Sequence, residues 1–180
     1  MKSVEPIRTK KELNSIERFL GSRSLRNLLI FLMGTNCGLR ISDILNLNVG
    51  DITKENYIDL TEKKTGKHKR FPINSKLKPL LNEFTRNRHT NEPLFLSRCG
   101  NRMERTQCYR MIYHACKQAG IKYIVGTHTL RKTFGYHHYK KYRDIAILQK
   151  MFNHSSPYIT LRYIGIDQDA IDKSYSHFVL

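Results

Sequence analysis

The chain has 180 residues, enough for one ordinary domain, and its 39% hydrophobic content with 10 Tyr and 8 Phe is enough for a buried core. The 32 lysines and arginines against 15 aspartates and glutamates give a formal net charge of +17, which indicates a polyanion as partner. The sequence has no signal-peptide pattern and no unbroken apolar run of about 18 residues, so it favours nucleic acid over a membrane surface.

The four cysteines are widely spaced and include no Cys-x-x-Cys pair. A zinc site requires paired ligand spacing, and a disulfide framework is typical of shorter secreted chains. We therefore expect buried free thiols in a reducing cytoplasm at Cys37, Cys99, Cys108 and Cys116.

The chain begins with two predicted helices. The first covers residues 9–20, is capped by Thr9 and ends at Gly21. Ser22 or Ser24 caps the second.

The second helix has an apolar stripe at helical spacing, which predicts a face packed in the core. The stripe is formed by Leu25, Leu28, Leu29, Leu32 and Met33. Residues 34–38, with a glycine at each end, are expected to break this helix. A short helix over residues 42–47 and a turn over residues 48–51 follow.

Two strand-like runs, residues 57–60 and 69–73, then predict a β-hairpin, because Thr65-Gly66 separates them. This hairpin is basic, and four of its residues are expected to bind DNA if the partner is DNA. They are Lys63, Lys67, Lys69 and Arg70.

The second half of the chain is predicted to be helical over residues 76–88, 104–119, 127–142 and 144–152, and again from Pro157. Thr127 is expected to cap the third of these helices. In the tail, Ile171, Tyr175 and Phe178 follow i, i+4, i+7 spacing and predict a short amphipathic helix that needs a surface to cover. The expected fold is mainly α with one small antiparallel sheet, an α+β domain.

Three short motifs favour chemistry on a phosphodiester. Their residues are Gly38, Leu39, Arg40 and Asp43, then His128 and Arg131, then Asn153, His154 and Tyr163. Arg40 offers a planar fork for bidentate phosphate binding at a helix start. His128 and Arg131 are spaced i, i+3 and project from one helix face near its N-terminus. Together such groups offset charge that develops on a pentacovalent phosphorus.

These motifs, in this order and with nine residues from His154 to Tyr163, resemble the tyrosine recombinases of the phage integrase family, from about residue 5 to the C-terminus. The resemblance implies that Arg40, His128, Arg131 and His154 bind the scissile phosphate and that Tyr163 is the nucleophile. It also implies that Asp43 braces Arg40.

The family has a mobile lysine in the hairpin that protonates the departing 5′ oxygen. The resemblance assigns this role to Lys64, and its neighbours Lys63 and Lys67 remain alternatives. Tyr158 is the nearest rival to Tyr163, but it follows His154 by only four residues. A phenol has a pKa near 10, so attack requires nearby cations to help remove the proton.

Asn153 stands where many family members have glycine. Asparagine tolerates the left-handed backbone region, so this departure does not put the mechanism in doubt. Lys132, beside Arg131, is expected to contact DNA.

The implied activity is site-specific DNA recombination, in integration or excision, through a 3′-phosphotyrosyl intermediate. That chemistry implies no metal and no other cofactor. The implied partners are double-stranded DNA and, on DNA, a homotetramer, in the prokaryotic cytoplasm with the nucleoid.

Most family members have an N-terminal helical core-binding domain, whereas here the motif region begins almost at Met1. We therefore expect a single catalytic domain over residues 1–180, without a core-binding domain, that is either excised or stands alone. Residues 167–180 are the candidate segment for docking on a neighbouring protomer. Two alternatives remain open: a type IB topoisomerase-like nicking and closing activity, and a non-catalytic DNA-binding regulator of the same fold.

Overall fold

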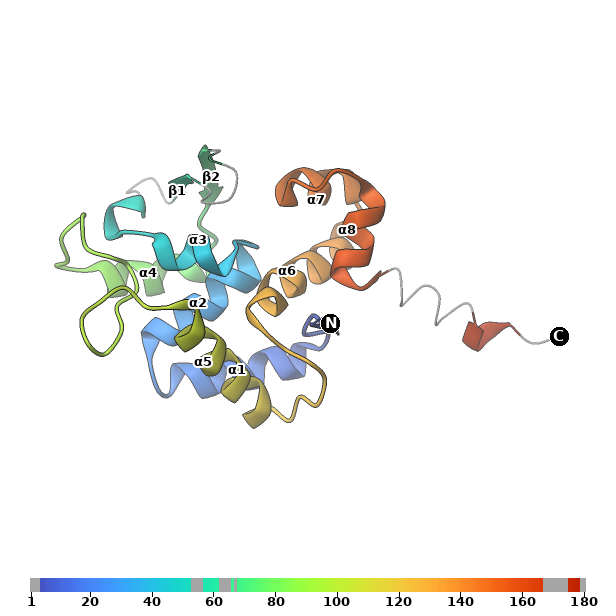
Figure 1. The fold of residues 1–180 in the computed structure, drawn as a ribbon, viewed down its shortest axis with the longest axis horizontal. Helices are drawn as coiled ribbons and strands as arrows, with labels where there is room; N and C mark the ends of the chain where they lie inside the picture. The colour runs from blue at the N-terminus through green and yellow to red at the C-terminus, as the bar shows by residue number, and fades with distance from the viewer. Residues whose placement is uncertain (1–3, 53–56, 62–65, 67, 167–174, 179–180) are drawn as a thin grey trace.

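The computed structural model describes residues 4–52, 57–61, 66, 68–166 and 175–178, and all structural statements below concern these residues (Figure 1). The helices and strands in chain order are α1 (Lys10–Gly21), α2 (Leu25–Asn36), α3 (Ile41–Asn46), the 3-10 turn η1 (Val49–Asp51), β1 (Tyr57–Thr61), β2 (His68–Pro72), α4 (Leu77–Thr85), α5 (Arg105–Gln118), α6 (Thr127–Tyr142), α7 (Ile145–Phe152) and α8 (Pro157–Ile164). The prediction of a mainly helical fold with one small antiparallel sheet is confirmed. Within the described residues, no helix is long and apolar enough to cross a membrane.

The predicted hairpin is present. Strands β1 and β2 pair antiparallel, with Tyr57 opposite Pro72 and Thr61 opposite His68. The predicted hairpin residues Lys63, Lys64 and Lys67 lie outside the described residues.

Local capping explains where the first two helices begin. The Thr9 hydroxyl accepts a hydrogen bond from the Glu12 backbone N–H at 3.1 Å, and the Glu12 carboxylate accepts one from the Thr9 N–H at 3.2 Å. Of the two candidate serines, Ser24 caps α2, because its Oγ accepts from the N–H of Asn27. A capping interaction depends only on residues within one turn, so sequence predicts it well.

Two predicted boundaries were wrong. Helix α2 does not break at Gly34 but continues to Asn36. Gly34 lies where α6 packs against α2, and a Cβ there would be 2.6 Å from the Cβ of Leu130. Helix α6 begins at Thr127, but the cap position is Gly126, whose N–H donates to the Thr129 hydroxyl at 3.0 Å. In both cases a tertiary contact or a side chain three residues away outweighs the local residue preference.

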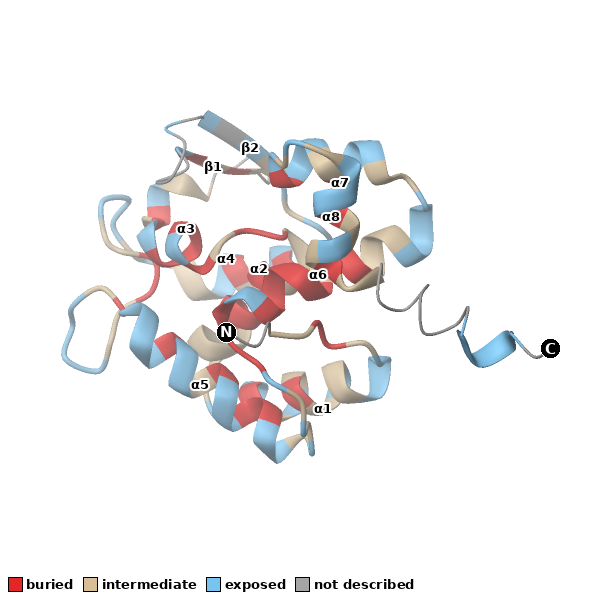
Figure 2. Cartoon of the chain, turned by 45° about the vertical axis from the view of Figure 1, so that its right-hand side comes forward, coloured by how far each residue is buried: buried red, intermediate tan, exposed pale blue. Residues whose placement is uncertain are grey.

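The core has two parts, and α6 joins them. The main cluster surrounds α2, where the run from Leu29 to Met33 is buried on all sides, as Figure 2 shows. A smaller cluster of Leu148, Phe152 and Ile164 packs α7 and α8 against the far half of α6 (Figure 1). The first turns of α6 therefore lie between the main body and the α7–α8 pair, and they carry His128 and Arg131.

The cysteine prediction holds in part. Cys108 and Cys116 are buried free thiols, and burial raises the pKa of each to about 12. Cys37 is half-buried and Cys99 is exposed, so the prediction of burial was wrong for Cys99.

The tail is only partly described. Ile171 lies outside the described residues, while Tyr175 and Phe178 are exposed.

Candidate active site

Arg131 is the residue that ties the three sequence motifs together. Its side chain is buried, and its Nη1 donates to the carbonyl of Gly38 at 2.5 Å while its Nη2 donates to the carbonyl of Phe152 at 3.1 Å. The guanidinium carbon also lies 4.3 Å from the centre of the Phe152 ring. One buried cation thus links α6 to the loop before Arg40 and to the end of α7.

The loop before Arg40 requires a glycine at position 38. Gly38 has φ 64°, in the left-handed region, and a Cβ there would lie 2.4 Å from Cδ1 of Phe134. This conformation turns the Gly38 carbonyl toward Arg131, and the carbonyl accepts a hydrogen bond from the Arg131 Nη1. The Gly-Leu-Arg motif is therefore built on backbone geometry as well as on the arginine.

Arg40 stands at the N-cap of α3 and approaches the acidic residue predicted to brace it. Its Nη1 lies 3.8 Å from Oδ2 of Asp43, and the Asp43 side chain is only 1% exposed. A buried carboxylate needs a nearby cation, so this pair orders the Arg40 side chain at the surface of the site.

His154 is positioned by α7 and α8. Asn153 ends α7 with φ 56° and ψ 46°, so the residue where many family members have glycine does adopt the left-handed conformation. The His154 Nδ1 lies 3.0 Å from the Oγ1 of Thr160, a buried residue that also contacts the carbonyl of Ser156. Burial, with the charges of Arg131 and Arg40, lowers the pKa of His154 below its ordinary value.

Tyr163 lies among these residues with its hydroxyl 3.4 Å from Nδ1 of His128. Its ring meets the rings of His154 and Phe152 edge to face, at centroid distances of 5.1 and 5.6 Å. The rival Tyr158 is 58% exposed and lies outside this cluster. The structure therefore brings Tyr163 together with the cationic residues and leaves Tyr158 on the surface.

The pKa of Tyr163 lies above its ordinary value because burial of the phenol outweighs the opposing effect of Arg131 and Arg40. The pKa of His128 lies below its ordinary value, through burial of the ring and the charges of Arg105, Arg131, Lys132 and Arg40. His128 is therefore a neutral imidazole near pH 7, beside a protonated phenol. This is the arrangement of a proton acceptor next to a nucleophile that must lose its proton.

The remaining predicted residues are placed differently. Lys132 is buried, its Nζ donates to the carbonyl of Val4 at 2.8 Å, and it lies 5.3 Å from the centre of the Tyr163 ring. Lys132 is thus largely covered by the protein, and the expectation that it contacts DNA stays a prediction. Arg70 is exposed on β2, where its guanidinium carbon lies 3.9 Å from the centre of the Tyr57 ring. Lys69 is in β2.

Two residues near the site were missed from sequence. Thr160 holds the His154 ring, but a threonine inside a short helix carries no sequence signal for that role. Arg105, the first residue of α5, is exposed and its charge lowers the pKa of His128. It lies 23 positions before His128, so only the fold brings the two together.

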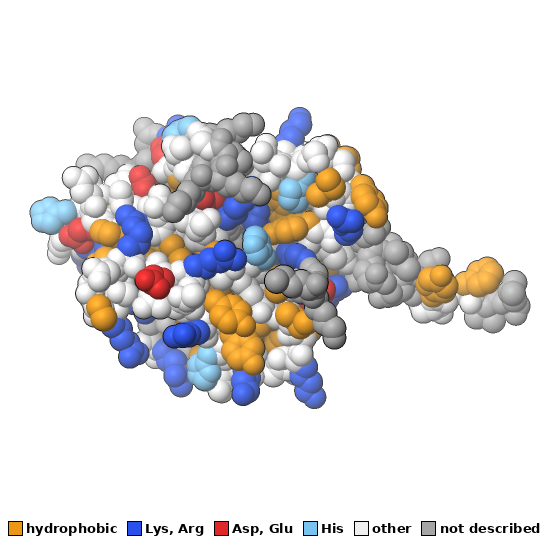
Figure 3. All heavy atoms as spheres, viewed as in Figure 1, with side chains coloured by type: hydrophobic (Ala, Val, Ile, Leu, Met, Phe, Trp, Pro, Cys, Tyr) orange, Lys and Arg blue, Asp and Glu red, His pale blue; other side chains and the backbone are white. Residues whose placement is uncertain are grey.

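One face of the molecule is rich in basic side chains. Figure 3 shows lysine and arginine side chains distributed over this face of the molecule, with few acidic ones between them. In the part of the chain that the structure describes, no group of three His, Cys, Asp or Glu residues is arranged to hold a metal ion.

Comparison with known proteins gives one consistent result. The phage integrase family matches residues 8–169 of the chain. The chain is 43% identical over 179 residues to the probable integrase/recombinase YoeC of Bacillus subtilis (strain 168), covering 99% of this chain and 98% of YoeC.

Two solved structures share the fold. The crystal structure of XerA recombinase superposes with a TM-score of 0.77 at 23% identity, covering 98% of this chain and 64% of that one. The crystal structure of XerH bound to palindromic difH substrate, a post-cleavage complex, gives a TM-score of 0.74 at 20% identity, covering 98% of this chain and 54% of that one. The chain therefore spans almost all of YoeC and less than two thirds of these two recombinase chains.

Proposed function

The chain belongs to the phage integrase family, and from this premise we propose that it is a tyrosine recombinase that cleaves and rejoins DNA at specific sites through Tyr163. The observation that carries the proposal is the convergence of Arg40, Arg131, His154 and His128 around one phenol hydroxyl. Together with Tyr163 of α8, these residues come from the N-cap of α3, from α6 and from the α7–α8 turn, and a surface that only attracts DNA does not need them to converge.

The first chemical step follows from the protonation states. The Tyr163 oxygen attacks the phosphorus, and its proton passes to Nδ1 of His128, which is neutral because its pKa is lowered. Because burial keeps the Tyr163 phenol protonated, attack proceeds with proton transfer to His128 rather than from a preformed phenolate. The 3′ phosphate becomes bonded to Tyr163 and the bond to the 5′ oxygen breaks.

The arginines supply the electrostatic part of catalysis. Charge grows on the phosphoryl oxygens in the transition state, and two fixed guanidinium groups, with donors from His154, stabilise it. Arg131 contributes from a position already fixed by two backbone carbonyls, so little reorganisation is needed. The leaving 5′ oxygen requires a proton, and Lys64 remains our proposed donor.

Rejoining reverses the same step. A 5′ hydroxyl of another strand attacks the phosphotyrosyl bond, and the phosphate returns to DNA while Tyr163 regains its proton. The covalent bond conserves the energy of the broken phosphodiester, so the cycle as proposed uses no ATP and no metal ion.

The proposed partners are double-stranded DNA and further copies of the chain. The formal charge of +17 and the exposed basic residues support DNA, and XerH, a protein of the same fold, is bound to its difH substrate in the crystal. For strand exchange we propose a tetramer on DNA in which residues 167–180 dock on a neighbouring copy. The expected place of action is the prokaryotic cytoplasm, with the nucleoid.

The experiment that tests this function is covalent trapping on nicked suicide DNA fragments in EDTA. The fragments come from the source genome, and the adduct is digested and its peptides are identified by mass spectrometry. We expect an adduct at Tyr163 that Tyr163→Phe abolishes and that the matched control Tyr158→Phe retains. An adduct on Tyr158, or none at all despite DNA binding, would overturn the assignment.

A further inference from the structure

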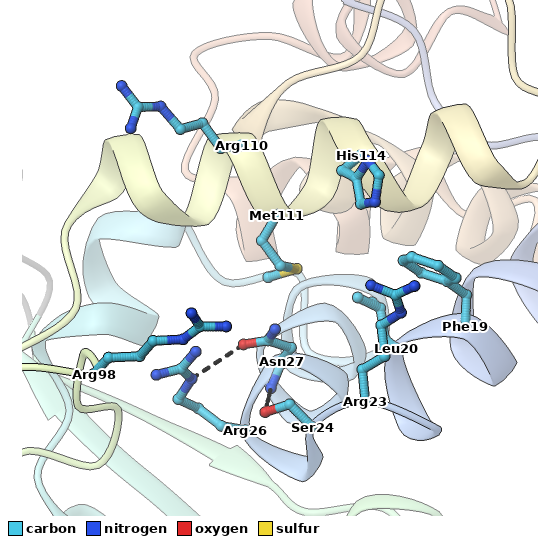
Figure 4. Close-up of a pocket in the computed structure, with 10 residues that line it drawn as sticks. All are labelled: Phe19, Leu20, Arg23, Ser24, Arg26, Asn27, Arg98, Arg110, Met111 and His114. Atoms are coloured by element: carbon cyan, nitrogen blue, oxygen red, sulfur yellow. Dashed lines mark hydrogen bonds between the residues drawn. The ribbon is translucent and has the colours of Figure 1, made fainter.

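A pocket lined by arginines lies away from the candidate active site. It has a volume of about 780 Å³ and is formed by α5, the turn between α1 and α2, and the loop before α5 (Figure 4). Its basic side chains are those of four arginines and one histidine: Arg23, Arg26, Arg98, Arg110 and His114. No aspartate or glutamate is among the described residues that line it. We call these five residues the arginine groove.

Several of these side chains are held in place by uncharged neighbours. Arg26 donates from Nη1 to the carbonyl of Leu96 at 2.5 Å and from Nε to Oδ1 of Asn27 at 3.1 Å. The guanidinium carbon of Arg23 lies 4.5 Å from the centre of the Phe19 ring. Cations that are fixed in this way lose little side-chain entropy when they bind an anion.

The Phe19 ring orders the opposite wall as well. The His114 ring meets it edge to face at a centroid distance of 5.5 Å. Figure 4 shows this aromatic pair at one end of the pocket, with Arg26 and Arg98 close together at the other and Met111 between them. The groove therefore has Met111 in its middle, Arg23 at one end and Arg26 with Arg98 at the other, while the Arg110 side chain extends from the other side of α5.

The cations repel one another in the structure. Burial and the charge of Arg98 both lower the pKa of Arg26. Among the residues that the structure describes, none of the four arginines forms an ion pair with a carboxylate. An anion bound between them would remove this repulsion, so the groove has the electrostatics of an anion site.

The shape of the site favours an extended anion. A second pocket of about 590 Å³ is also lined by Arg26, Arg98 and Arg110, so the two pockets adjoin. Adjoining open pockets suit a chain of phosphates better than a single small anion.

Helix α5 connects the groove to the catalytic residues. Arg105 stands at its first position and acts electrostatically on His128. Arg110 and His114 lie five and nine residues further, roughly 7 and 14 Å along the helix axis. This is the distance of about two to four nucleotides along one DNA strand.

We propose that the arginine groove binds the DNA backbone on one side of the cleaved phosphodiester. The proposal rests on the function proposed above, and it extends the DNA contact from the catalytic residues along α5. It assigns the groove an affinity role that is separate from the chemistry at Tyr163.

The test compares two double variants that each remove two exposed positive charges. Arg23→Gln with Arg98→Gln changes the groove and avoids Arg26, which donates to the Leu96 carbonyl. Lys78→Gln with Arg86→Gln, both exposed on or next to α4, is the matched control. Affinity for a 30-base-pair duplex is measured by fluorescence anisotropy over a range of KCl concentrations.

In a plot of log affinity against log salt concentration, we expect the line to be less steep for the groove variant. The magnitude of its slope should be smaller by about 1.8, since each lost phosphate contact contributes about 0.9. The control variant should keep the wild-type slope. Equal slopes in all three proteins would overturn the proposal.

A second arm locates the contact once trapping has mapped a cleavage site. Uncharged methylphosphonates are placed one at a time on the DNA flanks of that site. A methylphosphonate at a phosphate that the arginine groove contacts should weaken DNA binding by the wild type. The same methylphosphonate should not weaken DNA binding by the groove variant any further. An equal loss in both proteins at every position would place the contact elsewhere.

Adduct formation at saturating DNA separates this proposal from the proposed function. If wild type and groove variant both form the adduct, differing in affinity alone, both proposals stand. If neither forms it while the slopes still differ, the recombinase assignment fails and the groove remains a nucleic-acid site.

Discussion

The hydroxyl of Tyr163 lies 3.4 Å from Nδ1 of His128, across 35 positions of sequence. The phenol is protonated because burial raises its pKa, and the imidazole is neutral because burial and four neighbouring cations lower its pKa. The two shifts keep the proton on Tyr163 and leave the His128 ring neutral before attack, so the proton has to move while the bond to phosphorus forms. They also determine how cleavage should depend on pH.

We predict that the second-order rate of adduct formation falls in acid, because protonated His128 cannot accept the Tyr163 proton. Since the pKa of His128 lies below the ordinary value of a histidine, the rate should be level near pH 7 and decline only at pH values below the ordinary histidine range. His128→Gln should lower the rate by about 10²–10⁴ and remove the decline. His89→Gln, an exposed loop histidine, is the control, and a decline that persists in His128→Gln would assign the proton acceptor elsewhere.

The Arg40–Asp43 pair predicts a partial rescue. Arg40→Gln should abolish cleavage and also lower stability by about 3 kcal/mol, because it leaves the buried Asp43 carboxylate without this cation. Adding Asp43→Asn should recover much of the stability, measured by urea unfolding, and none of the cleavage. Recovery of cleavage in the double variant would show that Arg40 acts only through Asp43.

The buried position of Lys132 predicts that it positions Tyr163 instead of binding DNA. Lys132→Met keeps the hydrocarbon stem but removes the ammonium group near the Tyr163 ring and the bond to Val4. Cleavage should fall by roughly tenfold, the equivalent of about 1.4 kcal/mol, while the salt dependence of DNA binding stays unchanged. Arg70→Gln, on the exposed hairpin, should show the reverse pattern. Cleavage at saturating DNA should be unchanged, and the slope of log affinity against log salt concentration should be smaller in magnitude by about 0.9 per lost contact. A weaker salt dependence in Lys132→Met would instead support the DNA contact expected from the sequence.

The left-handed conformation of Asn153 predicts a contrast between two substitutions. Asn153→Gly should change the free energy of unfolding by no more than about 0.5 kcal/mol, because glycine adopts φ 56° without strain. Asn153→Val should cost about 1–2 kcal/mol and slow cleavage, because the strain falls next to His154. The neighbouring control Ser155→Val should be close to neutral. A harmless Asn153→Val would mean that the α7–α8 turn has another acceptable conformation.

Local chemistry explains what could be predicted well. The α1 capping box, the hairpin and the left-handed residue at Asn153 each depend on residues within one turn or one hairpin of each other. The same holds for the motif spacing of His128 with Arg131 and of His154 with Tyr163. Such short-range relationships can be read from the sequence alone, and they were enough to indicate the family and to propose the residues of the site.

The residue types, their order and the reaction that they favour can therefore be read from the sequence. Which groups are buried and which residues meet depends on the fold: Lys132 is buried with its Nζ 5.3 Å from the centre of the Tyr163 ring, Gly34 continues a helix, and Arg131 donates to two backbone carbonyls. The physical reason is that burial and proximity depend on how α6 packs between two clusters that lie far apart in the chain. The pKa values of Tyr163 and His128 follow from that packing, and no local pattern contains them.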